Sequence, residues 1–277
     1  MKTIQLFLLG CLLSFPAFAD VAPNQKQALL DLYHATNGSS WNHTWDINAD
    51  ASTWYGVTIQ DDKVTAIELS FNNLKGELPQ SLGDLQDLVK LDLAFNALEG
   101  EIPASFYTLS KLQEVKLFSN RLSGEISANI ENLTHLKHLE LFNNNFSGSI
   151  PSNIGKLVSL ETLLLSSNKF IGKLPHTIGD LTALQILSVF DNNLFGNVPS
   201  TIGKLANLEE LVLANNAFYG DLPSELEMCT NLKTLMIGNN GFKGEFANFQ
   251  ERFPNIIMFE FENSNSKGTI ATLDTED

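Results

Sequence analysis

The chain has 277 residues and a formal net charge of −15, and 43% of its residues are hydrophobic while 18% are charged. This composition is typical of globular proteins and argues against a largely disordered chain. The negative charge disfavours nucleic acids and anionic membrane surfaces as partners, because phosphate contacts need lysine and arginine. Basic or neutral partners suit such a chain better.

The segment 1–19 differs from the rest of the chain. Lys2 precedes an almost wholly apolar stretch over residues 4–15, and the small-residue sequence Ala17-Phe18-Ala19 ends the segment. This pattern predicts a signal peptide, and hence a secreted or extracytoplasmic protein. An alternative is a lipoprotein that carries its lipid at Cys11. The apolar stretch is too short for a membrane span, and no later segment approaches one.

Cysteines are scarce in this sequence. Cys11 would leave with the signal peptide, so Cys229 is the single cysteine of the expected mature chain. We therefore expect no internal disulfide, and a fold that is stabilised by its hydrophobic core alone.

A period of 24 residues dominates the sequence. The pattern L-x-x-L-x-L-x-x-N-x-L-x-G-x-I-P starts at Val64 and restarts at Leu88, Leu112, Leu136, Leu160, Leu184, Leu208 and Leu232. It forms eight full units over residues 64–255 and a partial ninth from Ile256. Such repetition predicts a solenoid in which each unit buries its apolar face against its neighbours.

Each repeated position has a physical role. Leucine alternates with polar residues, as at Leu91 and Leu93, which predicts one short strand per unit and a parallel sheet of stacked strands. The asparagine after each strand can satisfy backbone groups that no strand pairs with. Glycine recurs where a side chain would obstruct the backbone, and proline fixes the return path. The asparagines are Asn72, Asn96, Asn120, Asn144, Asn168, Asn192, Asn216 and Asn240.

The fifth unit shows the full pattern. It reads Leu160-x-x-Leu163-x-Leu165-x-x-Asn168-x-Phe170-x-Gly172-x-Leu174-Pro175-x-x-Ile178-Gly179-x-Leu181. This sequence resembles the plant-type leucine-rich repeat, a class that includes the ectodomains of receptor-like kinases and the polygalacturonase-inhibiting proteins. The resemblance implies an α/β leucine-rich-repeat solenoid with a curved parallel sheet on its concave face and a helical N-terminal cap.

Residues 20–63 resemble the N-terminal cap of that class. Asn24 is expected to cap a helix that runs to about Tyr33, with Gln27 in the capping-box position and Asn37-Gly38 as the stop. A hairpin is expected between residues 57–60 and 63–69.

Aromatic residues follow the expected helix. Trp41, Trp45, Trp54 and Tyr55 are expected to seal the end of the core, because terminal repeats need a cover. The sequence Trp54-Tyr55-Gly56-Val57 resembles the Trp-x-Gly-Val signature, but Thr58 stands where plant members carry a cysteine. Such caps look more like those of secreted bacterial or protist repeat proteins, so inhibition of a polygalacturonase is not carried over.

The repeat pattern weakens near its C-terminal end. Ala247 replaces the proline of the eighth unit, and Ser264 and Ser266 replace the asparagine and leucine of the ninth. We expect residues 256–277 to form a partial ninth repeat, a C-terminal cap and an acidic tail.

Residue types that carry chemistry do not gather in known patterns. The five histidines show no metal-ligand spacing with cysteine or acidic residues, and the glycines follow the repeat rather than clustering in a phosphate loop. Glu68 and Asp92 could form a carboxylate pair on adjacent strands, although a solvated surface is the ordinary outcome. We expect no enzyme activity, no metal site and no cofactor.

Strand residues that face away from the core are free to bind a partner. Their columns combine into an apolar strip in the middle and late units, and exposed apolar strips usually mark binding surfaces. Charged residues beside the strip suit a protein interface. The candidate residues on the concave face are Phe118, Phe142, Phe190, Leu164, Ile186, Val212, Met236, Lys116, His138 and Glu140.

These observations favour non-catalytic recognition of a protein or peptide. Alternatives are binding of a cell-wall or extracellular polysaccharide on the same phenylalanines, and a structural or adhesive surface protein. Sequons at Asn37, Asn42, Asn132 and Asn145 would carry glycans in a eukaryote, and one at Asn145 would weaken the apolar strip.

Overall fold

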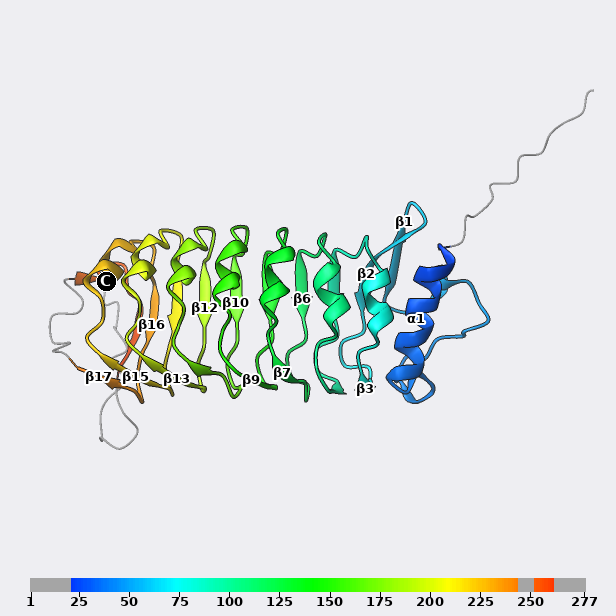
Figure 1. Cartoon of the computed structure of the whole chain (residues 1–277), viewed down its shortest axis with the longest axis horizontal. Coiled ribbons are helices and arrows are strands. Elements are labelled where there is room, and N and C mark those ends of the chain that lie inside the picture. The colour runs from blue at the N-terminus through cyan, green and yellow to red at the C-terminus, as the bar shows by residue number, and fades with distance from the viewer. Residues whose placement is uncertain (1–20, 244–251, 262–277) are drawn as a thin grey trace, which may run out of the picture.

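The computed structural model describes residues 21–243 and 252–261. Its main feature is a ten-stranded sheet whose strands succeed one another along the long axis of the molecule, as Figure 1 shows. β1 (Val57–Gln60) and β2 (Lys63–Glu68) pair antiparallel, and each later pair is parallel. The later strands are β4 (Lys90–Asp92), β6 (Glu114–Lys116), β8 (His138–Glu140), β10 (Thr162–Leu164), β12 (Ile186–Ser188), β14 (Glu210–Val212), β16 (Thr234–Met236) and β18 (Met258–Glu260).

The register of this sheet repeats the period of the sequence. Leu139 pairs with Leu163, and Leu163 pairs with Leu187, so neighbours across the sheet are 24 residues apart. Equivalent positions of successive units therefore lie in straight columns across the strands. The predicted parallel sheet and its alignment are confirmed.

A row of short 3-10 helices completes the units. Six of the residues before these helices are prolines, among them Pro79 and Pro103, which supports their role on the return path. The helices stack on one another along the solenoid (Figure 1). They are η3 (Gln80–Asp84), η4 (Ala104–Thr108), η5 (Ala128–Asn132), η6 (Ser152–Lys156), η7 (His176–Asp180), η8 (Ser200–Lys204) and η9 (Ser224–Met228).

Shorter strands follow the main strands along the chain and precede the 3-10 helices, and they form smaller sheets of their own. β3 (Lys75–Glu77) pairs with β5 (Ala97–Glu99), and β7 (Ser123–Glu125) pairs with β9 (Asn145–Ser147). A four-stranded sheet, which we call the second sheet, joins β11 (Ile171–Gly172), β13 (Asn193–Gly196), β15 (Ala217–Gly220) and β17 (Gly241–Phe242).

The N-terminal helix α1 (Pro23–Ala35) covers the first end of the solenoid (Figure 1). The expected capping box is wrong. The helix begins at Pro23, which suits the first helical position, so Ala22 is the N-cap residue and has no side-chain group to form a cap. Gln27 donates to Asp31 instead. The expected stop is confirmed, since Asn37 adopts the left-handed conformation with φ of 59° just after the helix. Two further 3-10 turns follow, η1 (Gly38–Ser40) and η2 (Ala51–Thr53).

Three tryptophans close this end of the core. Trp41, Trp45 and Trp54 are buried, and Trp45 stacks on Trp54 with ring centroids 4.7 Å apart. Tyr55 was expected to join them, and that expectation is wrong. It is 48% exposed and stacks on His43 instead, with centroids 4.3 Å apart.

The repeated asparagines form a series of hydrogen bonds that we call the asparagine ladder. The side chain of Asn144 donates to the carbonyl oxygens of Leu117 and Leu141 at 2.9 and 3.1 Å, and its oxygen accepts from the backbone N–H of Leu122 at 3.0 Å. Other units repeat these contacts, for example at Asn192. The asparagines therefore link consecutive turns, as the sequence predicts.

Several sequence expectations fall outside the described residues. They concern the signal peptide, Ala247, Ser264, Ser266 and the acidic tail.

Candidate functional site

The main sheet has one face that points away from the buried leucines, and we call it the open face. Each strand contributes side chains to it at alternate positions, such as Glu114 and Lys116 of β6, while the intervening Val115 is buried. Because the strands pair in strict register, these side chains form columns along the whole solenoid.

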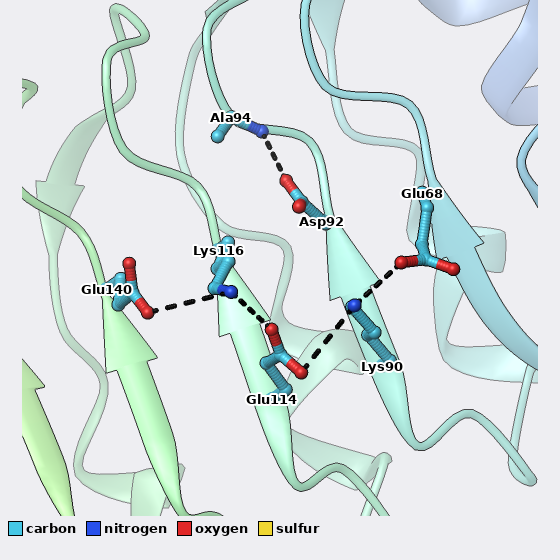
Figure 2. Close-up of polar contacts among 7 residues, drawn as sticks. All are labelled: Glu68, Lys90, Asp92, Ala94, Glu114, Lys116 and Glu140. Atoms are coloured by element: carbon cyan, nitrogen blue, oxygen red, sulfur yellow. Dashed lines mark hydrogen bonds and ion pairs between the residues drawn. The ribbon is translucent and has the colours of Figure 1, made fainter.

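Ion pairs cross the open face from β2 to β8, as Figure 2 shows. Lys90 Nζ lies 2.6 Å from Glu68 Oε1 and 3.8 Å from Glu114 Oε2. Lys116 Nζ lies 2.5 Å from Glu114 Oε1 and 3.9 Å from Glu140 Oε1. We call this series from Glu68 to Glu140 the ion-pair ladder.

The carboxylate pair considered for Glu68 and Asp92 does not form as a unit. The two residues are neighbours in register. Glu68, however, pairs with Lys90, and Asp92 accepts a hydrogen bond from the backbone N–H of Ala94 at 3.1 Å (Figure 2).

The pKa values of the two glutamates beside Lys116 are shifted in opposite directions. Burial alone would raise the pKa of Glu114, but the hydrogen bond from Lys116 and nearby positive charges outweigh it, so the pKa is lowered. Burial raises the pKa of Glu140, because its more distant contact with Lys116 does not compensate. Glu140 is thus the least well compensated carboxylate of the ladder.

Four phenylalanine rings border the ladder in one continuous row. Phe71 and Phe95 stack with centroids 4.1 Å apart, Phe95 meets Phe118 edge to face at 5.1 Å, and Phe118 stacks on Phe142 at 4.3 Å. Phe71 and Phe95 are 63% and 43% exposed, while Phe118 and Phe142 are half-buried. We call these four residues the aromatic row.

Sequence reasoning placed only Phe118 and Phe142 here and missed the other two. Phe71 and Phe95 each come just before the repeated asparagine of their unit, where the backbone turns with φ of 55° and 53°. Strict alternation does not describe side-chain direction in this left-handed conformation. The signal was a bulky aromatic at a position where other units carry Asn, Asp or Ser, the residues suited to that conformation.

The later strands carry the apolar part of the open face. Leu164, Ile186, Phe190 and Met236 are half-buried there, as expected for a strip that is partly accessible. Val212 is only 6% exposed, so the expectation that it contributes to an exposed strip is wrong. It is in register with Ser188 and Met236 on the adjacent strands.

The remaining candidates lie in their expected columns. His138 is half-buried between Glu114 and Thr162, its partners in register. Lys116 and Glu140 belong to the ion-pair ladder. The ring of Phe190 is separated from the aromatic row by Ser166, whose hydroxyl contacts that of Ser188 at 2.7 Å.

Comparisons with known proteins agree with this architecture. A model described as a leucine-rich repeat region matches residues 120–253, and the leucine-rich repeat model matches residues 63–85 and 87–109. The chain belongs to the leucine-rich-repeat family. Its repeats are of the plant type. A search of curated proteins gives no match.

Solved leucine-rich-repeat structures include receptors with bound peptides. The plant peptide hormone receptor RGFR1 in complex with RGF2 is 38% identical, and the match covers 71% of this chain and 32% of that one with a TM-score of 0.69. The Arabidopsis receptor kinase HAESA, with the peptide hormone IDA and the co-receptor SERK1, is 29% identical over 88% of this chain and 42% of that one, with a TM-score of 0.79.

The matched relatives differ in length from this chain. The leucine-rich-repeat chain spans about a third of the length of the first of these receptors. A plant ice-binding protein covers 88% of this chain and 96% of its own with a TM-score of 0.55, but at 24% identity that likeness concerns the fold alone.

In the described ranges, no three His, Cys, Asp or Glu side chains lie close enough to hold a metal ion. No helix within those ranges is long and apolar enough to cross a membrane. A cleft beside the second sheet is lined in part by Lys173, His176 and Tyr219, away from the open face.

Proposed function

We propose that this chain recognises a protein or peptide ligand outside the cytoplasm, without catalysis, through the open face of its main sheet. The observation that carries the proposal is the half-buried apolar strip of Leu164, Ile186, Phe190 and Met236 beside the charged ladder. Apolar anchors next to charged residues are typical of protein interfaces. The predicted signal peptide supports a location outside the cytoplasm.

The peptide complexes among the solved relatives support the same class of ligand. RGFR1 is a plant peptide hormone receptor in complex with RGF2, and HAESA is in complex with the peptide hormone IDA. Both share the fold of this chain over most of its length. A sheet of parallel strands with open columns suits an extended segment that lies across the strands.

The stacking within the aromatic row leaves less flat ring surface for a sugar than four separate rings would. A sugar ring stacks on the flat face of an aromatic side chain. In the pairs Phe71–Phe95 and Phe118–Phe142 the ring planes are 16° and 11° apart at stacking distance, so the rings cover one face of each other. Their edges, which carry partial positive charge, remain for contacts with carbonyl groups and apolar side chains.

A pair of substitutions within one repeat tests the proposal. Phe190 lies on the open face, whereas Phe195 lies on β13 of the second sheet and is 44% exposed. Serine occurs naturally at both positions in other units, at Ser166 and at Ser147. Phe190→Ser and Phe195→Ser are therefore matched variants that the fold should accept.

The test uses a random peptide library displayed on phage and selected on the full chain. We expect selected peptides to bind the Phe195→Ser variant like the original chain and to bind Phe190→Ser at least about tenfold more weakly, the loss expected for one anchor residue. Equal binding to both variants, or selection of no peptide, would overturn the proposal. Binding of a polysaccharide array that Phe118→Ala and Phe142→Ala abolish would favour the alternative.

A further inference from the structure

Charge is compensated unevenly along the open face. From β2 to β6, the carboxylates Glu68 and Glu114 each have a lysine within 2.6 Å, namely Lys90 and Lys116. Asp92, between them on β4, accepts the backbone N–H of Ala94. These groups satisfy one another and have little left to offer to a ligand.

From β8 onward the balance changes. The open-face positions of β8 to β16 contain no lysine and no arginine. The ion-pair partner of Glu140 is Lys116, whose Nζ lies 3.9 Å from Glu140 Oε1 but 2.5 Å from Glu114 Oε1. Glu210 on β14 forms no ion pair among the described residues, and Asp191 adds a third carboxylate beside Phe190.

These carboxylates lie next to apolar side chains. Glu140 is in register with Leu164, and Glu210 is in register with Ile186 and Thr234. Phe142 lies two residues beyond Glu140 and faces Phe118. A cation placed at Glu140 would thus meet a half-buried carboxylate beside aromatic rings, an environment that strengthens its attraction.

The spacing of the two glutamates sets the spacing of the ligand's cations. Their strands are three steps apart, and the residues occupy columns offset by two positions, so the side chains stand roughly 15 Å apart at about 4.8 Å per strand. An extended peptide advances about 3.3 Å per residue. Four or five residues therefore span that distance.

We infer that the open face takes a basic peptide segment whose two Lys or Arg side chains, four or five residues apart, contact Glu140 and Glu210 while apolar residues between them pack on Ile186 and Leu164. This inference rests on the proposed function and names its ligand class. The chain's own excess of acidic residues on this half of the sheet is the complement of such a segment.

Selection from the same displayed library tests the inference, now with the glutamates changed one at a time. The variants are Glu140→Gln and Glu210→Gln, which keep the side-chain shape, and the matched control is Glu68→Gln at the other end of the sheet. Glu68 is already paired with Lys90 at 2.6 Å, so its loss should not affect ligand binding.

We expect selected peptides to be enriched in pairs of basic residues at the stated spacing. Their Kd should rise at least about tenfold in Glu140→Gln and in Glu210→Gln, and stay unchanged in Glu68→Gln. Peptides that need Phe190 but lack basic residues, or that bind all three variants alike, would overturn this inference and leave the proposed function intact. Selection of no peptide, or of peptides indifferent to Phe190→Ser, would overturn both.

Discussion

Phe118 and Phe142 stack face to face on adjacent strands, with ring centroids 4.3 Å apart and planes 11° apart. Because each ring packs against the other, their contributions to the free energy of unfolding should be coupled. We expect a double-mutant cycle of Phe118→Ala and Phe142→Ala, measured by urea unfolding, to give a coupling free energy of about 1 kcal/mol.

A double-mutant cycle of Phe142→Ala and Phe190→Ala is the control for this measurement. These residues stand two strands apart with Ser166 between them, and no contact between their rings is described. Their coupling free energy should be near zero. Equal coupling in the two cycles would contradict the stacking as the source of the effect.

The asparagine ladder should be a main source of stability. Asn144→Ala removes donors to Leu117 and Leu141 and an acceptor for Leu122, all in a buried turn. Each buried group left without a partner costs about 1 to 3 kcal/mol, so we expect a loss of at least about 3 kcal/mol in the free energy of unfolding. Asn132→Ala, at an exposed asparagine, should change it by less than about 0.5 kcal/mol. Similar losses in both variants would contradict this account.

Much of this fold follows from the sequence because the repeat imposes it. Leucines and asparagines at a period of 24 residues can be buried together only if the units stack in register, and Leu139, Leu163 and Leu187 do so. The sequence also predicted the columns of the open face. The N-cap of α1 was placed two residues too late, at Asn24 instead of Ala22, because Pro23 suits the first helical position and the helix already begins there.

Side-chain contacts between units were harder to predict. The direction of Phe71 and Phe95 depends on a left-handed backbone at the end of the strand, which alternation does not describe. Val212 is buried although its position in β14 alternates with that of the inward Leu211, so alternation alone does not predict its exposure. Which carboxylate each lysine of the ladder contacts depends on rotamers, since Lys116 has acidic neighbours both along its own strand and across from it.

Glu114 and Glu140 of the ion-pair ladder should make the stability of the fold depend on pH in opposite ways. The lowered pKa of Glu114 means that its ionised form stabilises the fold above its ordinary pKa of 4.5, and that this contribution is lost as the pH falls through the lowered value. The raised pKa of Glu140 means the reverse, because stability falls as the pH rises from 4.5 through the raised value.

Unfolding measured across that pH range in two variants checks these signs. At neutral pH, Glu114→Gln should lower the free energy of unfolding by up to about 1 kcal/mol, whereas Glu140→Gln should leave it unchanged or raise it. The difference between the two variants should shrink in acid. Destabilisation by Glu140→Gln at neutral pH, equal to that by Glu114→Gln, would contradict the assignment.

The thiol of Cys229 should be inert in the folded chain. Burial raises its pKa to about 11, and its Sγ lies 3.3 Å from the carbonyl oxygen of Ile202. Since the thiolate is the reactive form, we expect an aromatic disulfide reagent at pH 8 to modify Cys229 only after unfolding. Rapid modification of the native chain would show that the thiol is accessible.

The most direct test of the central claim is a crystal structure of the chain with a peptide selected from the library. We predict that the peptide crosses β8 to β14 on the open face, in contact with Ile186 and Phe190, with basic side chains at Glu140 and Glu210. A peptide seated instead on the second sheet, around Phe195 and Tyr219, would contradict the claim that the open face is the binding surface.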